Sequence, residues 1–291
     1  MNFLQVLIMA LIQGITEFLP VSSEGHLVIV EHLLKMDMTN EILLIMILHI
    51  GTLMAIFLVF RKDIVNLTLE LNNIFADIVR NTKTLLHNKT RNDVKRYQKV
   101  LSNDNRKFVV MLIVSTIPTA IIGWLLRPMT LKAQGSLLAT GAGLLITAVF
   151  LLVVNFTKQG DKKPLDMNYK IALLIGIVQG FTVLPGASRA GVTIAICLLC
   201  GLTCKFAIKY SFILSVPTII GATMVVLTTT PKESFVGIEI LYCVIGAIIA
   251  ALIGLVCIKM AFSLIKKNRL KYFAGYSLIV SVVATVCHFT K

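Results

Sequence analysis

The chain alternates long apolar segments with shorter polar ones. A helix needs about 20 predominantly apolar residues to cross the hydrocarbon core of a bilayer. Six apolar segments reach about this length without an internal break, and each is predicted to be a spanning helix: 41–60, 108–126, 136–155, 208–230, 237–258 and 272–289. The pattern therefore predicts an all-α integral membrane protein with six transmembrane helices.

Two further apolar stretches, 3–34 and 171–200, are interrupted in the middle by clusters rich in proline, glycine and serine. The halves on either side are too short to span a bilayer alone. Irregular backbone at membrane depth is tolerated only where it is buried in protein or lines a watery cavity. Each stretch is therefore predicted to be a re-entrant helix pair.

Composition agrees with this picture. Of 291 residues, 57% are hydrophobic and 14% charged, whereas soluble domains average about 45–50% apolar and about 25% charged residues. This excludes a disordered chain, a disulfide-rich secreted module and a nucleic-acid-binding domain. The six cysteines are predicted to be small packing residues, because the run from Cys197 to Cys204 lacks a second pair of metal ligands. The N-terminus has no basic region before its apolar run, so no cleaved signal peptide is expected.

The excess of basic residues predicts the orientation. The chain has 28 Lys and Arg against 14 Asp and Glu, and segment 61–107 alone holds 11 against 5. Because cytoplasmic loops are enriched in Lys and Arg, we expect segments 61–107, 156–170 and 259–271 to be cytoplasmic. The poorly charged connections 127–135 and 231–236 are then outside. Segment 61–107 is predicted to form one or two surface helices lying on the lipid headgroups.

These assignments agree only if 3–34 enters and leaves from the outside and 171–200 from the inside. The chain then forms a single membrane domain, 1–291, with an inverted-topology repeat. The first repeat covers about 1–155, with 61–107 as an insertion, and the second about 171–291. Gln-Gly-x-Thr, a Leu-Pro step and a serine three residues past the proline occur in both 13–23 and 179–188.

The first interruption gathers polar side chains that are costly inside a membrane and are therefore functional candidates. Gln13 and Glu17 are four residues apart, so they share one face of a helix. The polar residues that follow Pro20 are Ser22, Ser23, Glu24 and His26. This interruption thus brings a carboxylate, a carboxamide, hydroxyls and an imidazole to one helix break.

The second interruption has the chemistry of an anion site. A turn containing Gly186 and Ser188 precedes an apolar helix, and a helix start presents free backbone N–H groups. Arg189 adds a planar guanidinium suited to phosphate oxygens, and Thr193 adds a hydroxyl. Arg189 could equally pair with Glu17. Together the two breaks suit a phosphorylated amphiphile whose tail stays in lipid.

Segments 13–26 and 185–193 are similar to the two signature motifs of the undecaprenyl pyrophosphate phosphatase family, the bacitracin-resistance proteins of bacteria. The resemblance covers nearly the whole chain. It implies a metal-dependent membrane phosphatase that converts undecaprenyl pyrophosphate to undecaprenyl phosphate, which recycles the lipid carrier of peptidoglycan synthesis. It also implies a multi-pass protein of the bacterial plasma membrane whose site opens to the outer face.

By position in these motifs, the resemblance implies catalytic roles for Glu17, Ser23, His26 and Arg189. It implies substrate binding by Gln13, Ser22, Gly186, Ser188, Arg189 and Thr193. A divalent cation, Mg²⁺ or Ca²⁺, would be held by Glu17 and Gln13, since both cations prefer oxygen ligands.

Three positions depart from the family pattern. Gln13 stands where many members have a first glutamate, Glu24 where the residue is usually small and polar, and Ala190 where serine is common. Losing one carboxylate should weaken cation binding, and Glu24 is a candidate to compensate. The departures also leave open a paralogue with altered activity.

Several alternatives remain open at this level. His26 acts as general base or nucleophile, and Ser23 orients it or attacks instead; the third route is attack by water. A different class of function is a flippase of undecaprenyl phosphate, because inverted repeats with broken helices are typical of transporters. A purely structural membrane protein is disfavoured by the clustered polar residues. Expected partners are a polyprenyl pyrophosphate and membrane lipids, with no nucleic acid, and a homodimer stays open.

Overall fold

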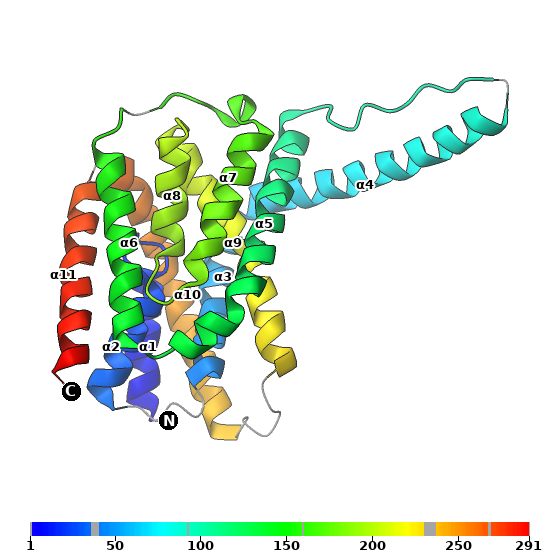
Figure 1. The fold of residues 1–291 in the computed structure, drawn as a ribbon. Helices are drawn as coiled ribbons and strands as arrows, with labels where there is room; N and C mark the ends of the chain where they lie inside the picture. Colours follow the sequence, from blue (N-terminus) through cyan, green and yellow to red (C-terminus); the bar gives the residue numbers. More distant parts are fainter. Residues whose placement is uncertain are drawn as a thin grey trace.

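The computed structural model describes residues 2–35, 41–91, 93–158, 160–229, 237–266 and 269–290. Its long helices run side by side in one bundle, and the described residues form no sheet (Figure 1). The helices in chain order are α1 Phe3–Thr16, α2 Ser23–Leu34, α3 Glu41–Val59, α4 Arg61–Thr90, α5 Asp104–Ala133, α6 Leu137–Asn155, α7 Tyr169–Gly180, α8 Arg189–Leu199, α9 Cys204–Thr229, α10 Gly237–Lys266 and α11 Leu270–Phe289. Short 3-10 turns, η2 Pro164–Asp166 and η3 Phe181–Val183, precede and follow α7.

The helices expected to span a membrane are present. Among the described residues, α5, α6, α9, α10 and α11 are long and apolar enough to cross a bilayer, and α3 with α4 adds a sixth candidate if a bent pair counts as one span. Between α3 and α4 the chain bends by 88°. The all-α membrane class is confirmed, and the predicted segment 41–60 ends where the chain turns sideways.

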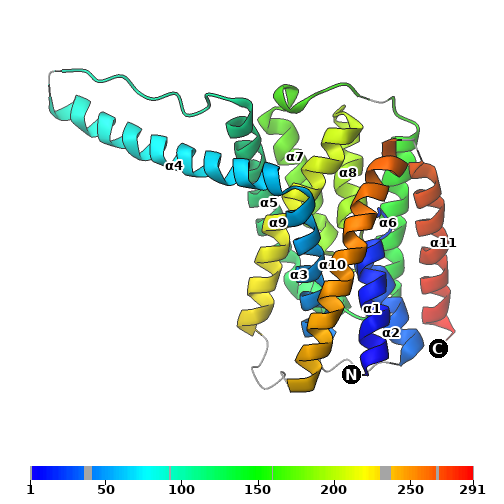
Figure 2. The same cartoon turned by 180° about the vertical axis from the view of Figure 1, so that it is seen from behind.

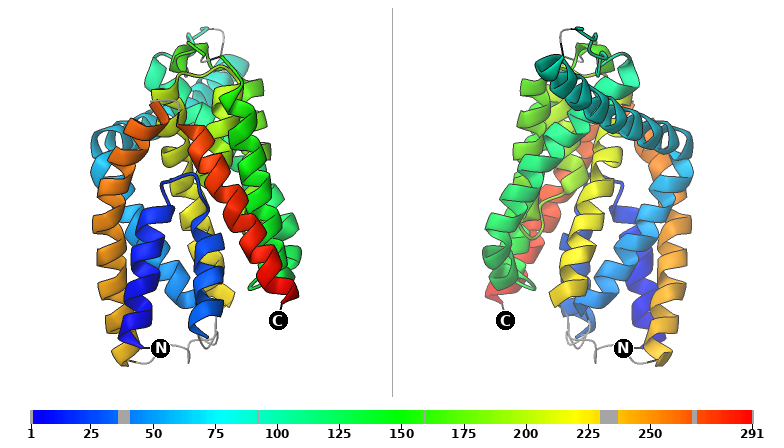
Figure 3. Two further views of the ribbon diagram at one scale, coloured as in Figure 1. Left: turned by 90° about the vertical axis from the view of Figure 1, so that its left-hand side faces the viewer. Right: turned by 90° about the vertical axis from the view of Figure 1, so that its right-hand side faces the viewer.

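The two interrupted stretches form helical hairpins. The α1–α2 hairpin starts at the end of the bundle that carries both termini, and its turn lies at mid-height (Figure 3). The α7–α8 hairpin starts at the other end, the one from which α4 projects, and its turn also reaches into the bundle (Figure 1). The two polar turns therefore meet inside the bundle.

Serine side chains start the second helix of each hairpin. Ser22 precedes α2, and its Oγ accepts a hydrogen bond of 3.1 Å from the Gly25 N–H. Ser188 precedes α8 and accepts one of 3.0 Å from Gly191. These caps satisfy N–H groups that a helix start leaves unpaired. Ser22, rather than the sequence match Ser23, thus fills the role of Ser188, which leaves the Ser23 hydroxyl available elsewhere.

A dense apolar core surrounds the inner ends of the hairpins. Phe18, in the first turn, packs edge-on against Phe212 of α9, with ring centroids 5.4 Å apart. Tyr210 is fully buried, and its hydroxyl donates to the Met111 carbonyl at 2.9 Å. All six cysteines are free thiols, and three of them are buried, in agreement with a packing role. The core therefore holds the polar turns at a fixed depth.

Candidate active site

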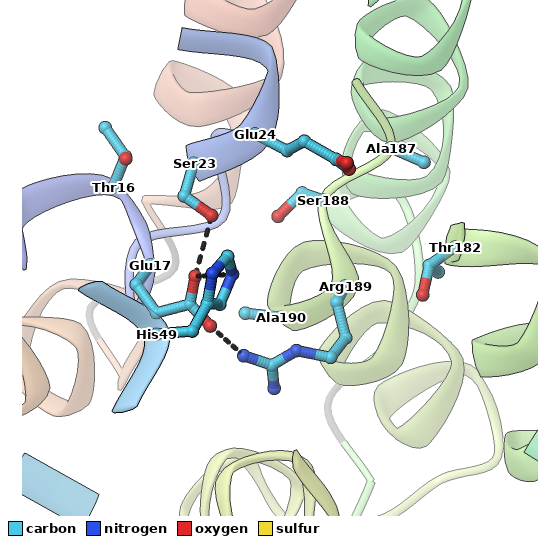
Figure 4. A pocket seen from close by; sticks show the side chains of 10 residues that line it. All are labelled: Thr16, Glu17, Ser23, Glu24, His49, Thr182, Ala187, Ser188, Arg189 and Ala190. Carbon is cyan, nitrogen blue, oxygen red and sulfur yellow. Dashed lines mark hydrogen bonds and ion pairs between the residues drawn. The ribbon is translucent and has the colours of Figure 1, made fainter. Parts of the chain in front are cut away.

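A polar pocket lies between the two hairpin turns (Figure 4). Its walls come from both hairpins and from α3. The lining residues are Thr16, Glu17, Ser23, Glu24, His49, Thr182, Ala187, Ser188, Arg189 and Ala190. The pocket thus joins residues from the two predicted motifs, which are more than half the chain apart.

Glu17 is the centre of this pocket. Only 5% of its surface is exposed. One carboxylate oxygen, Oε1, accepts a hydrogen bond from Arg189 of the opposite hairpin, and the two side chains form an ion pair. The other, Oε2, accepts from Ser23 Oγ at 2.7 Å and from Gln13 Nε2 at 3.1 Å. A buried carboxylate requires such partners, and here they come from both motifs.

Arg189 has binding capacity left after this pairing. It is the first residue of α8, so the helix start aims it into the space between the hairpins. Its Nη2 pairs with Glu17, while Nη1 is buried with no hydrogen-bond partner in the described part of the chain. A guanidinium has five N–H donors and suits phosphate oxygens. Arg189 can therefore pair with Glu17 and hold an anion at once.

Only part of the predicted anion site in the second turn is free. The Ser188 N–H donates to Thr147 Oγ1 at 2.8 Å, and the Gly191 N–H donates to Ser188 Oγ. Gly186 has φ +80°, and a Cβ there would lie 2.1 Å from the Thr140 carbonyl oxygen. Gly186 therefore lets the turn pack closely on α6. These internal bonds make Arg189 the main anion donor of the turn.

Two buried glutamines occupy corresponding places in the hairpins. Gln13 donates to Glu17, and its Oε1 has no partner among the described residues. Gln179 accepts from Thr193 Oγ1 at 3.1 Å, and its Nε2 is likewise unpartnered. Thr193 thus binds Gln179 and does not line the pocket. Its predicted contact with substrate stays a prediction.

His26 lies outside the pocket lining. Its Nδ1 is 2.7 Å from the Ser22 carbonyl oxygen, and its Nε2 is 2.7 Å from the Tyr276 hydroxyl of α11. The two rings are also stacked, with centroids 5.5 Å apart. A carbonyl partner requires the proton on Nδ1, so Nε2 accepts from Tyr276 when the ring is neutral. The catalytic role predicted for His26 stays a prediction.

His49 is a pocket residue that the motifs do not contain. Its Nδ1 is 2.8 Å from the Ile45 carbonyl oxygen, and its Nε2 faces Glu17 Oε2 at 3.6 Å. The signal was present in the sequence, because an ionisable residue inside a predicted span is a functional candidate by default. It lay in an unbroken apolar segment, away from the two motifs.

The pocket can supply only part of a cation site by itself. The described residues contain no group of three or more His, Cys, Asp and Glu side chains arranged to hold a metal. Two carboxylates, Glu17 and Glu24, line the pocket and offer hard oxygen donors. Gln13 does not line it, but its Oε1 has no partner among the described residues and its Nε2 is bonded to Glu17. Mg²⁺ is commonly bound by one or two carboxylates together with substrate phosphates and water. The donor set fits such a substrate-completed site.

This chain is similar to known proteins over nearly its whole length. The family model described as "Bacitracin resistance protein BacA" matches residues 6–283. An undecaprenyl-diphosphatase of Methanosphaera stadtmanae is 35% identical over 287 residues, which is 98% of each chain. Undecaprenyl-diphosphatases of Korarchaeum cryptofilum and Alkaliphilus metalliredigens are 32% and 31% identical, each over 97% of this chain and 98% of the relative. The chain therefore belongs to the bacitracin resistance protein BacA family.

Proposed function

We propose that this protein is an undecaprenyl-diphosphatase that hydrolyses undecaprenyl pyrophosphate to undecaprenyl phosphate and phosphate. One observation carries the proposal: Glu17 and Arg189, from opposite hairpins, meet in a polar pocket inside an apolar bundle. A pyrophosphate head group needs cationic donors, whereas a polyprenyl tail needs lipid. The names of the relatives agree with this substrate.

Arg189 binds the terminal phosphate in this mechanism. Its free Nη1 donates to a phosphate oxygen and stabilises the charge on the transferred group, which is the main protein contribution to phosphoryl transfer. Glu17 accepts a proton from the attacking group, either the Ser23 hydroxyl, which is already bonded to it, or a water molecule. Attack forms a new P–O bond to the terminal phosphorus, and the bridging P–O bond breaks to release undecaprenyl phosphate. With water as the attacking group, phosphate is released directly. With Ser23, a phosphoserine forms, and Glu17, after losing its proton to solvent, takes one from a water molecule that attacks the phosphorus, breaks the Oγ–P bond and releases phosphate. For His26 to act, it would first exchange its hydrogen bond with Tyr276.

A divalent cation, Mg²⁺ or Ca²⁺, is part of the proposal. Glu17, Gln13 Oε1 and Glu24 are the residues that would hold it, together with pyrophosphate oxygens. When bound, the cation neutralises pyrophosphate charge and so reduces repulsion of the attacking group. Gln13 and Glu17 keep their predicted roles, and Glu24 is the compensating carboxylate.

An inverted repeat of two re-entrant pairs and six spans is supported by how the hairpins pack. Helix α1 lies along α10, and α7 lies along α5. A Cβ at Gly14 would lie 2.8 Å from Ile253 Cβ, and one at Gly180 would lie 2.7 Å from Ile122 Cβ. The glycine that follows each repeated glutamine thus makes the same close approach to an isoleucine of the other half.

The positions of the positive segments support the proposed orientation. Helix α4, the connection between α6 and α7, and the start of α11 lie at one end of the bundle, and both termini lie at the other (Figure 2). The three segments that were predicted to be cytoplasmic are therefore consistent with a single face. The protein is proposed to lie in the plasma membrane with α4 in the cytoplasm and the α1–α2 hairpin entering from outside.

The direct test measures phosphate release from undecaprenyl pyrophosphate by the detergent-purified protein. We expect release that stops with EDTA and resumes when Mg²⁺ or Ca²⁺ is added. Gln13→Glu should lower the cation concentration for half-maximal rate by about tenfold, since two carboxylates bind these cations better than one. Gln179→Glu is the matched control in the other hairpin. Absence of release under all these conditions would refute the hydrolase proposal.

A flippase of undecaprenyl phosphate is the second candidate function. It is favoured by hairpins that enter from opposite ends and meet inside the bundle, an arrangement typical of alternating access. A pure flippase would move lipid phosphate across sealed vesicles and release no phosphate in detergent, where no two sides exist. The two assays therefore separate the candidates.

His49 is expected to support Glu17. His49→Ala should lower kcat roughly tenfold with a smaller change in KM, as is common for residues that orient a catalytic ligand. His32→Ala is the control, because His32 makes the same Nδ1 contact to a carbonyl four residues back, at 2.9 Å, but does not line the pocket. Equal kcat values for the two variants would exclude a role for His49.

A further inference from the structure

Helix α4 projects from the bundle as an arm (Figure 1). It has 30 residues and so is about 45 Å long at 1.5 Å per residue. It meets α3 at 88°, so it runs across the direction of the spans. The arm root is held by an ion pair between Asp63 and Lys209 of α9, with 2.7 Å between Oδ1 and Nζ. The geometry therefore lays the arm along a plane at one end of the bundle.

One face of the arm is covered by the chain that returns to α5, residues 93–103, here called the return segment. Asn81 and Asn88 make paired hydrogen bonds with the backbone of Gln98 and Lys95, at 2.7 to 3.0 Å. Glu70 and Asp77 lie on the same stripe of α4 and pair with Arg106 at 2.9 and 2.6 Å.

These bonds pair the polar side chains of this stripe, here called the covered stripe, with groups of the same chain. The hydrogen bond from Arg106 lowers the pKa of Glu70 below its ordinary value, with a smaller contribution from Asn103. Glu70 therefore stays ionised and neutralises Arg106. The return segment runs along the outer side of α4, away from the spans, in both opposite views (Figures 1 and 2). The other faces of α4 are left uncovered by the return segment.

A second face of the arm is apolar and exposed. Phe75 is 69% exposed and Leu86 60%. They share this face with further exposed residues: Leu71, Ile78, Val79 and Leu85. At ~100° per residue, the middle of this face lies about 120° around the helix from the covered stripe. An exposed apolar stripe several turns long marks an interaction surface.

The third face is basic. At ~100° per residue, its exposed cationic residues are Lys62, Arg80 and Lys83, and the exposed apolar residues Val65 and Leu69 also lie on it near the arm root. Arg61 lies where this face borders the apolar one. A helix with a continuous apolar face and a cationic edge lies in a membrane interface, with its apolar side chains about 5–10 Å into the headgroup and acyl boundary. Cationic side chains beside that boundary are attracted to anionic headgroups. The side chains of α4, its direction across the spans and its position at one end of the bundle all fit a helix lying on a membrane surface.

We propose that α4 is an interfacial anchor that binds the anionic lipid leaflet, with the Phe75 face in the acyl boundary and the basic face on the headgroups. The occupant of the apolar face is lipid, because that face borders cationic side chains that suit anionic headgroups and the polar stripe is already covered by the chain itself. A second copy of the chain could cover this face only by packing against a helix that runs perpendicular to the spans of the first copy. This anchor goes beyond the proposed phosphatase function and does not depend on it.

The test uses the full chain in nanodiscs of phosphatidylcholine and phosphatidylglycerol. Trp124 is the only tryptophan, so Trp124→Phe gives a silent background for Phe75→Trp. Val94→Trp is the control, because Val94 is an apolar residue that is 81% exposed and lies in the return segment, on the side of α4 away from the spans. We expect lipids with a shallow nitroxide to quench the tryptophan at position 75 about twofold or more, and the one at position 94 to be quenched mainly by aqueous iodide.

Other outcomes would overturn the anchor. Iodide quenching of both positions to the same extent would place the arm in water. Protection of position 75 from both quenchers would indicate a protein partner, including a second copy. Replacing phosphatidylglycerol by phosphatidylcholine should weaken the shallow quenching at position 75; no change would remove the anionic-lipid part of the proposal.

Discussion

Replacing Glu17 by glutamine is expected to reduce turnover of undecaprenyl pyrophosphate by about 10²- to 10⁴-fold, the range typical for loss of a general base. The substitution keeps the size of the side chain and removes the charge that pairs with Arg189. Glutamine has one acceptor oxygen where glutamate has two, so it cannot accept from both Ser23 and Arg189 as Glu17 does. The loss should appear in kcat, measured as phosphate release in detergent at saturating substrate and cation.

Glu31→Gln is the matched control for this experiment. Glu31 lies in the same hairpin and is 2% exposed, comparable to 5% for Glu17, but it does not line the pocket. Both variants should elute as folded protein on gel filtration in detergent. The usual loss on removing a general base is about 10²-fold or more. If the turnover of Glu17→Gln stayed within about threefold of wild type, the role of Glu17 as general base would be contradicted.

Replacing Arg189 by lysine should lower kcat/KM by about 10²-fold, and replacing it by alanine should lower kcat/KM further. Lysine keeps a positive charge beside Glu17 but has no planar pair of donors, so it cannot hold Glu17 and a phosphate oxygen in the same geometry. The present Arg189 has that second donor, because Nη1 is buried without a partner in the described residues.

The size of the lysine effect separates two roles for Arg189. If Arg189 only neutralised Glu17, Arg189→Lys would retain nearly full kcat/KM. Combining Arg189→Lys with Glu17→Gln measures how far the two side chains act as a unit, since losses from coupled residues are not additive. Fully additive losses would mean that the ion pair has no part in catalysis.

The helical architecture was largely predictable from the sequence, because the bilayer restricts which backbone structures can lie inside it. Lipid cannot satisfy backbone hydrogen bonds, so long apolar segments must be helices and broken ones must be buried. Segment 61–107 was predicted to form one or two surface helices, and the structure has one long helix there, α4, which projects from the bundle. The motif residues Glu17 and Arg189 were found because charge inside an apolar bundle is costly without a partner.

The contacts within the site were less predictable. Ser22 caps α2 although Ser23 is the match in the repeat, because the backbone before α2 turns one residue earlier than in α8. His26 was predicted in the site from its position in the motif, but Tyr276, 250 residues away, holds its Nε2. No local pattern encodes that pairing.

By itself, the sequence determined the membrane class, the two polar breaks, the basic segments and the family motifs. Periodicity, charge and composition are local properties of the sequence. In a bilayer, long apolar segments must form helices, and basic segments favour the cytoplasmic side. The sequence raised the pairing of Arg189 with Glu17 as one possibility, and the tertiary structure decided it and added His49 beside Glu17. Those partners lie on different helices, and their distances depend on the depth at which two hairpins are packed, which is set by the whole core.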